Sequence, residues 1–131
     1  MSKPKEPSEE TRRMVAGRDG YRCVRCGDDL DRIWSGHSIH HRHLRSHPYE
    51  HVHSPANLIC LCGSGTTGCH GWVHAHPAKA REYGWIVFMG NEHPETVPVW
   101  DARRGWMLLD DGGGWTPCDR DGNPSRWGRM R

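Results

Sequence analysis

The sequence has little of what builds a large apolar core. It contains one phenylalanine, an apolar share of 34%, and no stretch that approaches the ~18 apolar residues of a membrane helix. With 16 glycines and 9 prolines among 131 residues, the composition argues against a helix bundle and favours a loop-rich fold. A chain of this length buries a modest core, so we expect a small domain that needs additional bracing.

Lysine is also scarce, and the charge is close to balanced. Only 3 of the 18 basic residues are lysine, and the formal net charge is +2. This charge is too small to establish a polyanionic partner, although arginine suits bidentate contacts with phosphate. The N-terminal sequence MSKPKEPSEE lacks the apolar run of a secretory signal. We therefore expect a cytoplasmic protein with no membrane partner, in which the cysteines are metal ligands or spare thiols rather than disulfides.

Changes in composition divide the chain into a flexible tail (1–7), a main domain (8–86) and a C-terminal β-hairpin appendage (87–131). Ser8 is placed to cap a short helix that ends near Gly17.

SIHHRH (38–43), which reads like a short strand, and the apolar run NLICLC (57–62) predict two strands that face each other across a long loop. The following CHGWVHAHPAKAREYG (69–84) predicts a helix broken at Pro77. From WIVFMG (85–90) onward, short strands joined by glycine-containing turns predict a small antiparallel meander.

The spacing of the cysteines indicates a structural zinc site, because four thiolates can close a tetrahedral shell around zinc. The best quartet is Cys23, Cys26, Cys62 and Cys69. Cys60 competes with Cys62, since both would point to one face of a strand. We prefer Cys62 because it stands at the strand end, where the chain can turn toward Cys69. Cys118 stands apart and receives no role.

The histidines indicate a second metal site. His70 and His74 are four residues apart on the predicted helix, so both can reach one ion. His40 from the strand would complete a set of three protein ligands with open positions, which is typical of catalytic metals.

The adjacent His41 should face the other way, because successive strand residues point to opposite faces. A neutral imidazole there could act as a general base, and Asn57 could brace the loop or orient this ring. Six other histidines are expected to be solvated loop residues: His37, His43, His47, His51, His53 and His93.

The combination of CVRCG, SIHHRH, NLICLC and CHGWVH resembles the HNH endonucleases, also called ββα-metal nucleases. LCGSGTTGCHGWVH looks like variants common in bacteriophages of actinobacteria. The name-giving His, Asn and His correspond to His41, Asn57 and His70, and His40 and His74 match the extra metal-binding histidines of colicin-type members. The resemblance spans roughly residues 10–86. Many members have Asp where this chain has His40, so the ion preference stays open.

The resemblance implies an α+β fold: a small zinc-braced ββα-metal domain with short flanking helices and a C-terminal antiparallel β meander. It implies hydrolysis of DNA phosphodiesters by a water that His41 deprotonates, with His70 also in the catalytic set. The expected cofactors are structural Zn²⁺ and one divalent cation, Mg²⁺, Mn²⁺, Ni²⁺ or Zn²⁺. Arg42 and Arg45 flank the site and either bind phosphates or are merely solvated.

The expected partners are double-stranded DNA and, for a packaging role, phage terminase or other packaging proteins in a bacterial host cell. Homing and restriction are alternative roles. The enzyme would either nick one strand of the DNA or cleave both strands. Two other classes compete: a non-catalytic zinc module that binds nucleic acid or protein, and a secreted domain held by disulfides.

Overall fold

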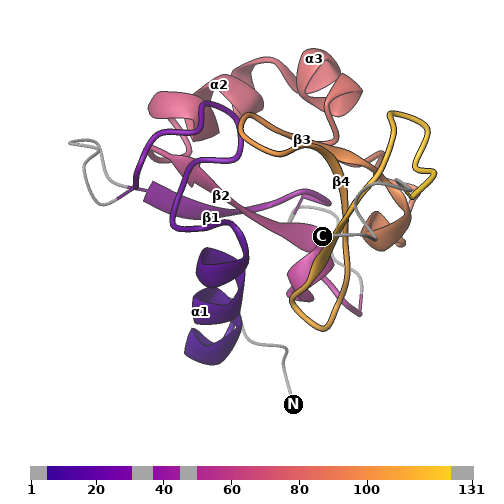
Figure 1. The fold of residues 1–131 in the computed structure, drawn as a ribbon. Coiled ribbons are helices and arrows are strands. Elements are labelled where there is room, and N and C mark those ends of the chain that lie inside the picture. Colours follow the sequence, from indigo (N-terminus) through magenta and orange to yellow (C-terminus); the bar gives the residue numbers. More distant parts are fainter. Residues whose placement is uncertain (1–5, 31–36, 45–49, 125–131) are drawn as a thin grey trace.

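The computed structural model describes residues 6–30, 37–44 and 50–124 of a mixed α+β fold with two small antiparallel sheets (Figure 1). The predicted positions 1–5 of the tail and Arg45 lie outside the described residues. The elements are α1 (Glu9–Arg18), β1 (His37–His41), β2 (Leu58–Cys62), α2 (Gly68–Ala75), α3 (Pro77–Glu82), β3 (Val99–Asp101), β4 (Gly105–Leu109) and β5 (Trp115–Pro117), with 3-10 turns at Pro55–Asn57 and Pro94–Thr96.

Helix α1 begins as the sequence predicts. The Ser8 side chain caps it by accepting a hydrogen bond from the Thr11 amide, and Glu9 and Glu10 place negative charge in the first turn. The helix continues to Arg18, one residue beyond the predicted end at Gly17.

The end of α1 is fixed by a buried ion pair. The Arg18 guanidinium lies 2.9 Å from the Asp19 carboxylate and also donates to the carbonyls of Pro55 and Leu58. The same carboxylate accepts a hydrogen bond from the Cys60 amide at 2.9 Å. Because each buried charge has several polar partners, the pair can fasten α1 to β2 despite the cost of desolvation.

Strands β1 and β2 form an antiparallel pair in which His40 lies opposite Ile59 and His41 opposite Leu58. Every residue of β2 is buried, since α1 and α2 both contact this strand. Figure 1 shows the pair between these two helices. The β1 edge therefore presents its histidines beside the helix that follows β2.

The predicted break at Pro77 is present. Proline has no amide hydrogen, so α2 ends at Ala75 and α3 opens at Pro77. Gly84 then reverses the chain with a φ of +74°, and a Cβ at this position would collide with the Pro98 carbonyl.

The strand predicted at 85–90 was wrong. Trp85 and Val87 are buried, but they form no ladder: the Val87 amide donates to the Arg42 carbonyl at 2.9 Å, whereas the Trp85 amide donates to the Ala80 carbonyl at 3.0 Å. Phe88 and Met89 then turn outward, with 61% and 59% of their surface exposed.

The C-terminal meander has the order β3-β4-β5, and Val99 pairs with Met107. Val99, Met107 and Leu109 belong to the same buried cluster as Leu58 and Ile59 of β2. The segment expected as an appendage thus packs into the core of the main domain. Within the described residues, no helix combines the length and apolarity needed to cross a membrane.

Candidate metal centres

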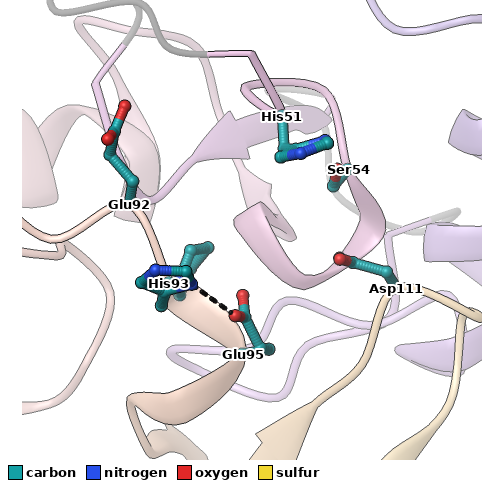
Figure 2. A pocket seen from close by; sticks show the side chains of 7 residues that line it. His51, Ser54, Glu92, His93, Glu95 and Asp111 are labelled. Atoms are coloured by element: carbon teal, nitrogen blue, oxygen red, sulfur yellow. Dashed lines mark hydrogen bonds and ion pairs between the residues drawn. The ribbon is translucent and has the colours of Figure 1, made fainter.

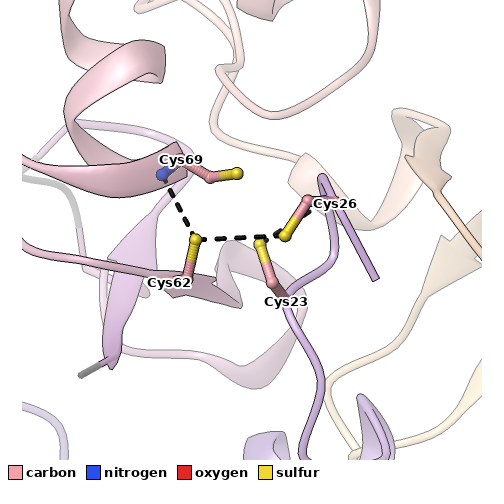
Figure 3. A group of neighbouring side chains, drawn as sticks. All are labelled: Cys23, Cys26, Cys62 and Cys69. Atoms are coloured by element: carbon pink, nitrogen blue, oxygen red, sulfur yellow. Dashed lines mark hydrogen bonds between the residues drawn. The ribbon is translucent and has the colours of Figure 1, made fainter. Parts of the chain in front are cut away.

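The four predicted cysteines meet at one point between three elements (Figure 3). Cys23 and Cys26 come from the turn after α1, Cys62 ends β2, and Cys69 lies in the first turn of α2. Their sulfurs all lie within 4.8 Å of one another, and those of Cys26 and Cys62 are 3.9 Å apart. Tetrahedral Zn–S bonds of ~2.3 Å place sulfurs about 3.8 Å apart. The group can therefore hold a zinc ion.

Local backbone geometry prepares this site. The Cys26 amide points at the Cys23 sulfur at 3.5 Å, and the Cys69 amide points at the Cys62 sulfur at 3.3 Å. Such N–H groups stabilise thiolates, which are the form that binds metal.

The structure brings Cys62, and not Cys60, into the quartet. Cys60 is fully buried, where burial and the charge of Asp19 raise the pKa of its thiol well above the ordinary range. Cys60 is thus a protonated core residue beneath the site.

Two thiols of the quartet, those of Cys23 and Cys26, have a raised pKa when no cation is bound. Desolvation of the sulfur raises the pKa of Cys26 to about 12, although the residue as a whole is exposed. The hydrogen bond with Cys69, followed by burial, raises the pKa of Cys23 still further. A divalent cation would displace these protons, so metal binding at the quartet must depend on pH.

The three predicted histidines also converge. The ligand nitrogens of His40, His70 and His74 lie within 4.8 Å of one another, and the Nε2 atoms of His70 and His74 are 3.0 Å apart. One turn of α2 separates the latter two, and His40 reaches them from β1. His40 is buried, His70 is half-buried and His74 is exposed, so the triad opens to solvent on one side.

Hydrogen bonds to groups outside the triad determine which ring nitrogens of His40 and His70 are available to bind a metal ion. His40 Nε2 lies 2.7 Å from the Trp85 carbonyl, which only accepts, so Nε2 carries the proton and Nδ1 is available for a metal. His70 Nδ1 bonds to Ser38 Oγ, whose hydroxyl donates to the Gly63 carbonyl at 3.1 Å. That hydroxyl must therefore accept from Nδ1, which leaves His70 Nε2 for the metal. Partners of this kind are typical of metal-binding histidines.

The environment keeps two of these imidazoles, His40 and His70, neutral. Burial, and then the neighbouring His70, hold the pKa of His40 well below its ordinary value. Burial, and then His74, lower the pKa of His70 to about 4. Neutral imidazoles are the form that binds metal, so His40 and His70 are ready for an ion at neutral pH.

His41 contacts a different partner from His40, as the alternation along a strand predicts. Its Nε2 lies 3.0 Å from Nδ1 of His53, and the two rings meet edge to face. The expectation that His53 and His43 are solvated was wrong: His53 is half-buried against His41, and His43 is 2% exposed with Nε2 bonded to the Met89 carbonyl at 2.8 Å. No spacing rule in the sequence indicates either contact.

Asn57 braces the loop, which was one of its two expected roles. Its side chain is fully buried, accepts from the His43 amide at 2.6 Å and donates to the Val52 carbonyl at 2.8 Å. Because Val52 precedes His53, this amide holds in place the segment that carries the partner of His41.

The role expected for Arg42 as a phosphate ligand is contradicted. The residue is 0% exposed, and its guanidinium donates to the carbonyls of Gly84, Ala56, Pro94 and Val97 at 2.7–3.0 Å. The side chain turns inward where β1 ends and joins three loops, so it has no access to DNA.

A polar pocket of about 250 Å³ lies near the turn Pro94–Thr96 (Figure 2). It is lined by His51, Ser54, Glu92, His93, Pro94, Glu95 and Asp111. His93 bonds to Glu95 at 3.0 Å. None of its lining residues belongs to either ligand group, and its carboxylates would repel phosphate.

Comparisons of the chain with protein-family models, with curated proteins and with solved structures found no match. The functional argument therefore depends on the geometry of the two ligand groups.

Proposed function

We propose that this protein is a metal-dependent DNA endonuclease of the HNH, or ββα-metal, type. The observation that carries the proposal is the triad: three imidazoles from a strand and a helix converge on one point that is open to solvent. Three protein ligands with an open side suit a catalytic ion, whereas structural ions are enclosed by four. The order β1, β2, α2 supports the same fold.

In this proposal His40 Nδ1, His70 Nε2 and His74 Nε2 hold the divalent ion. When bound, such an ion supplies positive charge that stabilises the phosphate as negative charge develops on it. His41 accepts a proton from the attacking water on a ring nitrogen, and His53 orients its ring. Asn57 keeps the loop of His53 in place. The cysteine quartet holds a structural zinc ion that fixes the start of α2.

The resemblance of LCGSGTTGCHGWVH to phage sequences supports a phage-encoded enzyme that acts on double-stranded DNA in a bacterial host. This resemblance fits a role in genome packaging together with terminase, or a role in homing.

The proposal is tested with supercoiled plasmid. Zinc-loaded protein is incubated with Mg²⁺, Mn²⁺, Ni²⁺ or additional Zn²⁺, and nicked and linear products are measured. We expect cleavage with at least one ion, and a loss of about 10²–10⁴-fold in rate for His41→Ala, as for other general bases. His93→Ala is the matched control, because this exposed histidine lies in the polar pocket away from the triad.

Intact plasmid with every ion, or equal cleavage by His41→Ala, would count against the enzyme. If the same preparation still retarded DNA in a gel, the non-catalytic zinc module would be the better description, since binding needs the quartet but not the triad.

A further inference from the structure

Arg25 lies between the two cysteines of the Cys-x-x-Cys turn but points away from solvent. Its Nη1 donates to the Cys69 sulfur at 3.3 Å. A guanidinium bonded to a thiolate offsets part of the negative charge that four such ligands collect around zinc. Arg25 therefore contacts the quartet from outside the ligand set.

The other contacts of Arg25 are aromatic. Its guanidinium carbon lies 3.8 Å from the centre of the Trp72 ring and 5.6 Å from that of Trp85. The Arg25 Nε is buried, and among the described residues it has no hydrogen-bond partner. The indole faces therefore hold this guanidinium, as expected for a desolvated cation–π contact.

These contacts reach both elements that position the triad. Trp72 stands on α2 midway between His70 and His74. Trp85 supplies the carbonyl that orients His40. Arg25 thus connects the quartet ligand Cys69 to α2, which carries His70 and His74. It also contacts Trp85, whose carbonyl orients His40.

We propose that Arg25 is a positioning residue that couples the two metal centres. Zinc in the quartet would fix the position of the Cys69 sulfur, and with it the guanidinium that donates to this sulfur. The guanidinium then keeps Trp72 and Trp85 at the separation that lets α2 and β1 share one ion. Metal in the quartet raises the affinity of the triad for its own ion, and by linkage the ion in the triad tightens the quartet equally.

Coupling between two sites of a protein is commonly 5–150-fold, so we expect an effect of about that size. The inference uses the two metal centres of the proposed function but not its chemistry.

The test measures binding of Ni²⁺ to the triad by titration calorimetry of the full-length, zinc-loaded protein. The variants are Arg25→Gln, which removes the charge, and Arg25→Lys, which keeps the charge but loses the planar group that stacks. Arg22→Gln is the matched control, since Arg22 belongs to the same turn but donates only weakly to the Gly27 carbonyl at 3.3 Å. Metal analysis verifies one zinc ion per chain in each sample.

We expect Arg25→Gln to weaken Ni²⁺ binding at least about fivefold, Arg25→Lys to restore part of it, and Arg22→Gln to stay within about twofold of the parent. Unchanged Ni²⁺ affinity in both Arg25 variants with zinc retained would overturn the coupling. If Arg25→Gln does not fold or keep zinc, Arg25→Lys decides by the same criterion. A protein that shows the coupling but leaves plasmid intact keeps this inference and loses the nuclease proposal.

Discussion

The ring of His40 is bonded through Nε2 to the carbonyl of Trp85, 45 residues further along the chain, at 2.7 Å. This contact sets the orientation of an imidazole that could hold a metal ion. Ser38 does the same for His70. The triad is thus preorganised by hydrogen bonds to groups outside its ligand set.

Ser38→Ala removes the acceptor that holds His70 Nδ1. The His70 ring is then free to rotate, so we expect Ni²⁺ affinity at the triad to fall about 10–100-fold, as for other outer-shell changes. Calorimetry measures the affinity. Ser54→Ala is the control, because this residue lies in the polar pocket. Equal affinities in the two variants would remove Ser38 from the account.

The stability of protein with an empty triad should fall as the pH is lowered from about 6.5 toward 4. An unfolded histidine has a pKa near ~6.5, whereas folding lowers the pKa of His70 to about 4. Between these values the unfolded state binds more protons, so unfolding becomes easier as the pH falls. Urea unfolding across this range measures the slope. His70→Asn should flatten it, and an unchanged slope would contradict the assignment.

Cys23→Ser should remove zinc from the quartet and unfold or aggregate the chain, because structural zinc supplies much of the folding energy in small domains. Thermal melting and metal analysis measure both effects. Cys118→Ser, outside the quartet, should keep zinc and the melting temperature of the parent. A zinc-free Cys23→Ser protein that melts like the parent would show that the fold does not depend on this metal.

Arg42→Met should destabilise the fold by about 3–5 kcal/mol, because three buried carbonyls and one part-buried carbonyl lose their charged donor. Chemical unfolding measures the free energy. Arg13→Met is the control, since Arg13 forms only an exposed pair with Glu9 and should change little. Normal stability with weakened DNA binding would instead return Arg42 to a phosphate-binding role.

Local rules were sufficient for several features of the site. Ser8 caps α1, Pro77 breaks the second helical stretch, and the spacing of His70 and His74 places both on one face of α2. Each depends on the conformation of a few neighbouring residues, which sequence reports directly. The predicted strand at 85–90 failed because its apolar pattern reflects burial under β1, not pairing in a sheet.

By itself the sequence determined which side chains could serve as ligands and their spacing along each element, because helix and strand periodicity depend on adjacent residues. Only the tertiary structure decided that Arg42 turns inward, that His53 lies against His41, and that Arg25 lies over the ring of Trp72 and near that of Trp85. These contacts join segments far apart in the chain. Their geometry comes from packing and from satisfying buried polar groups, which no local pattern encodes.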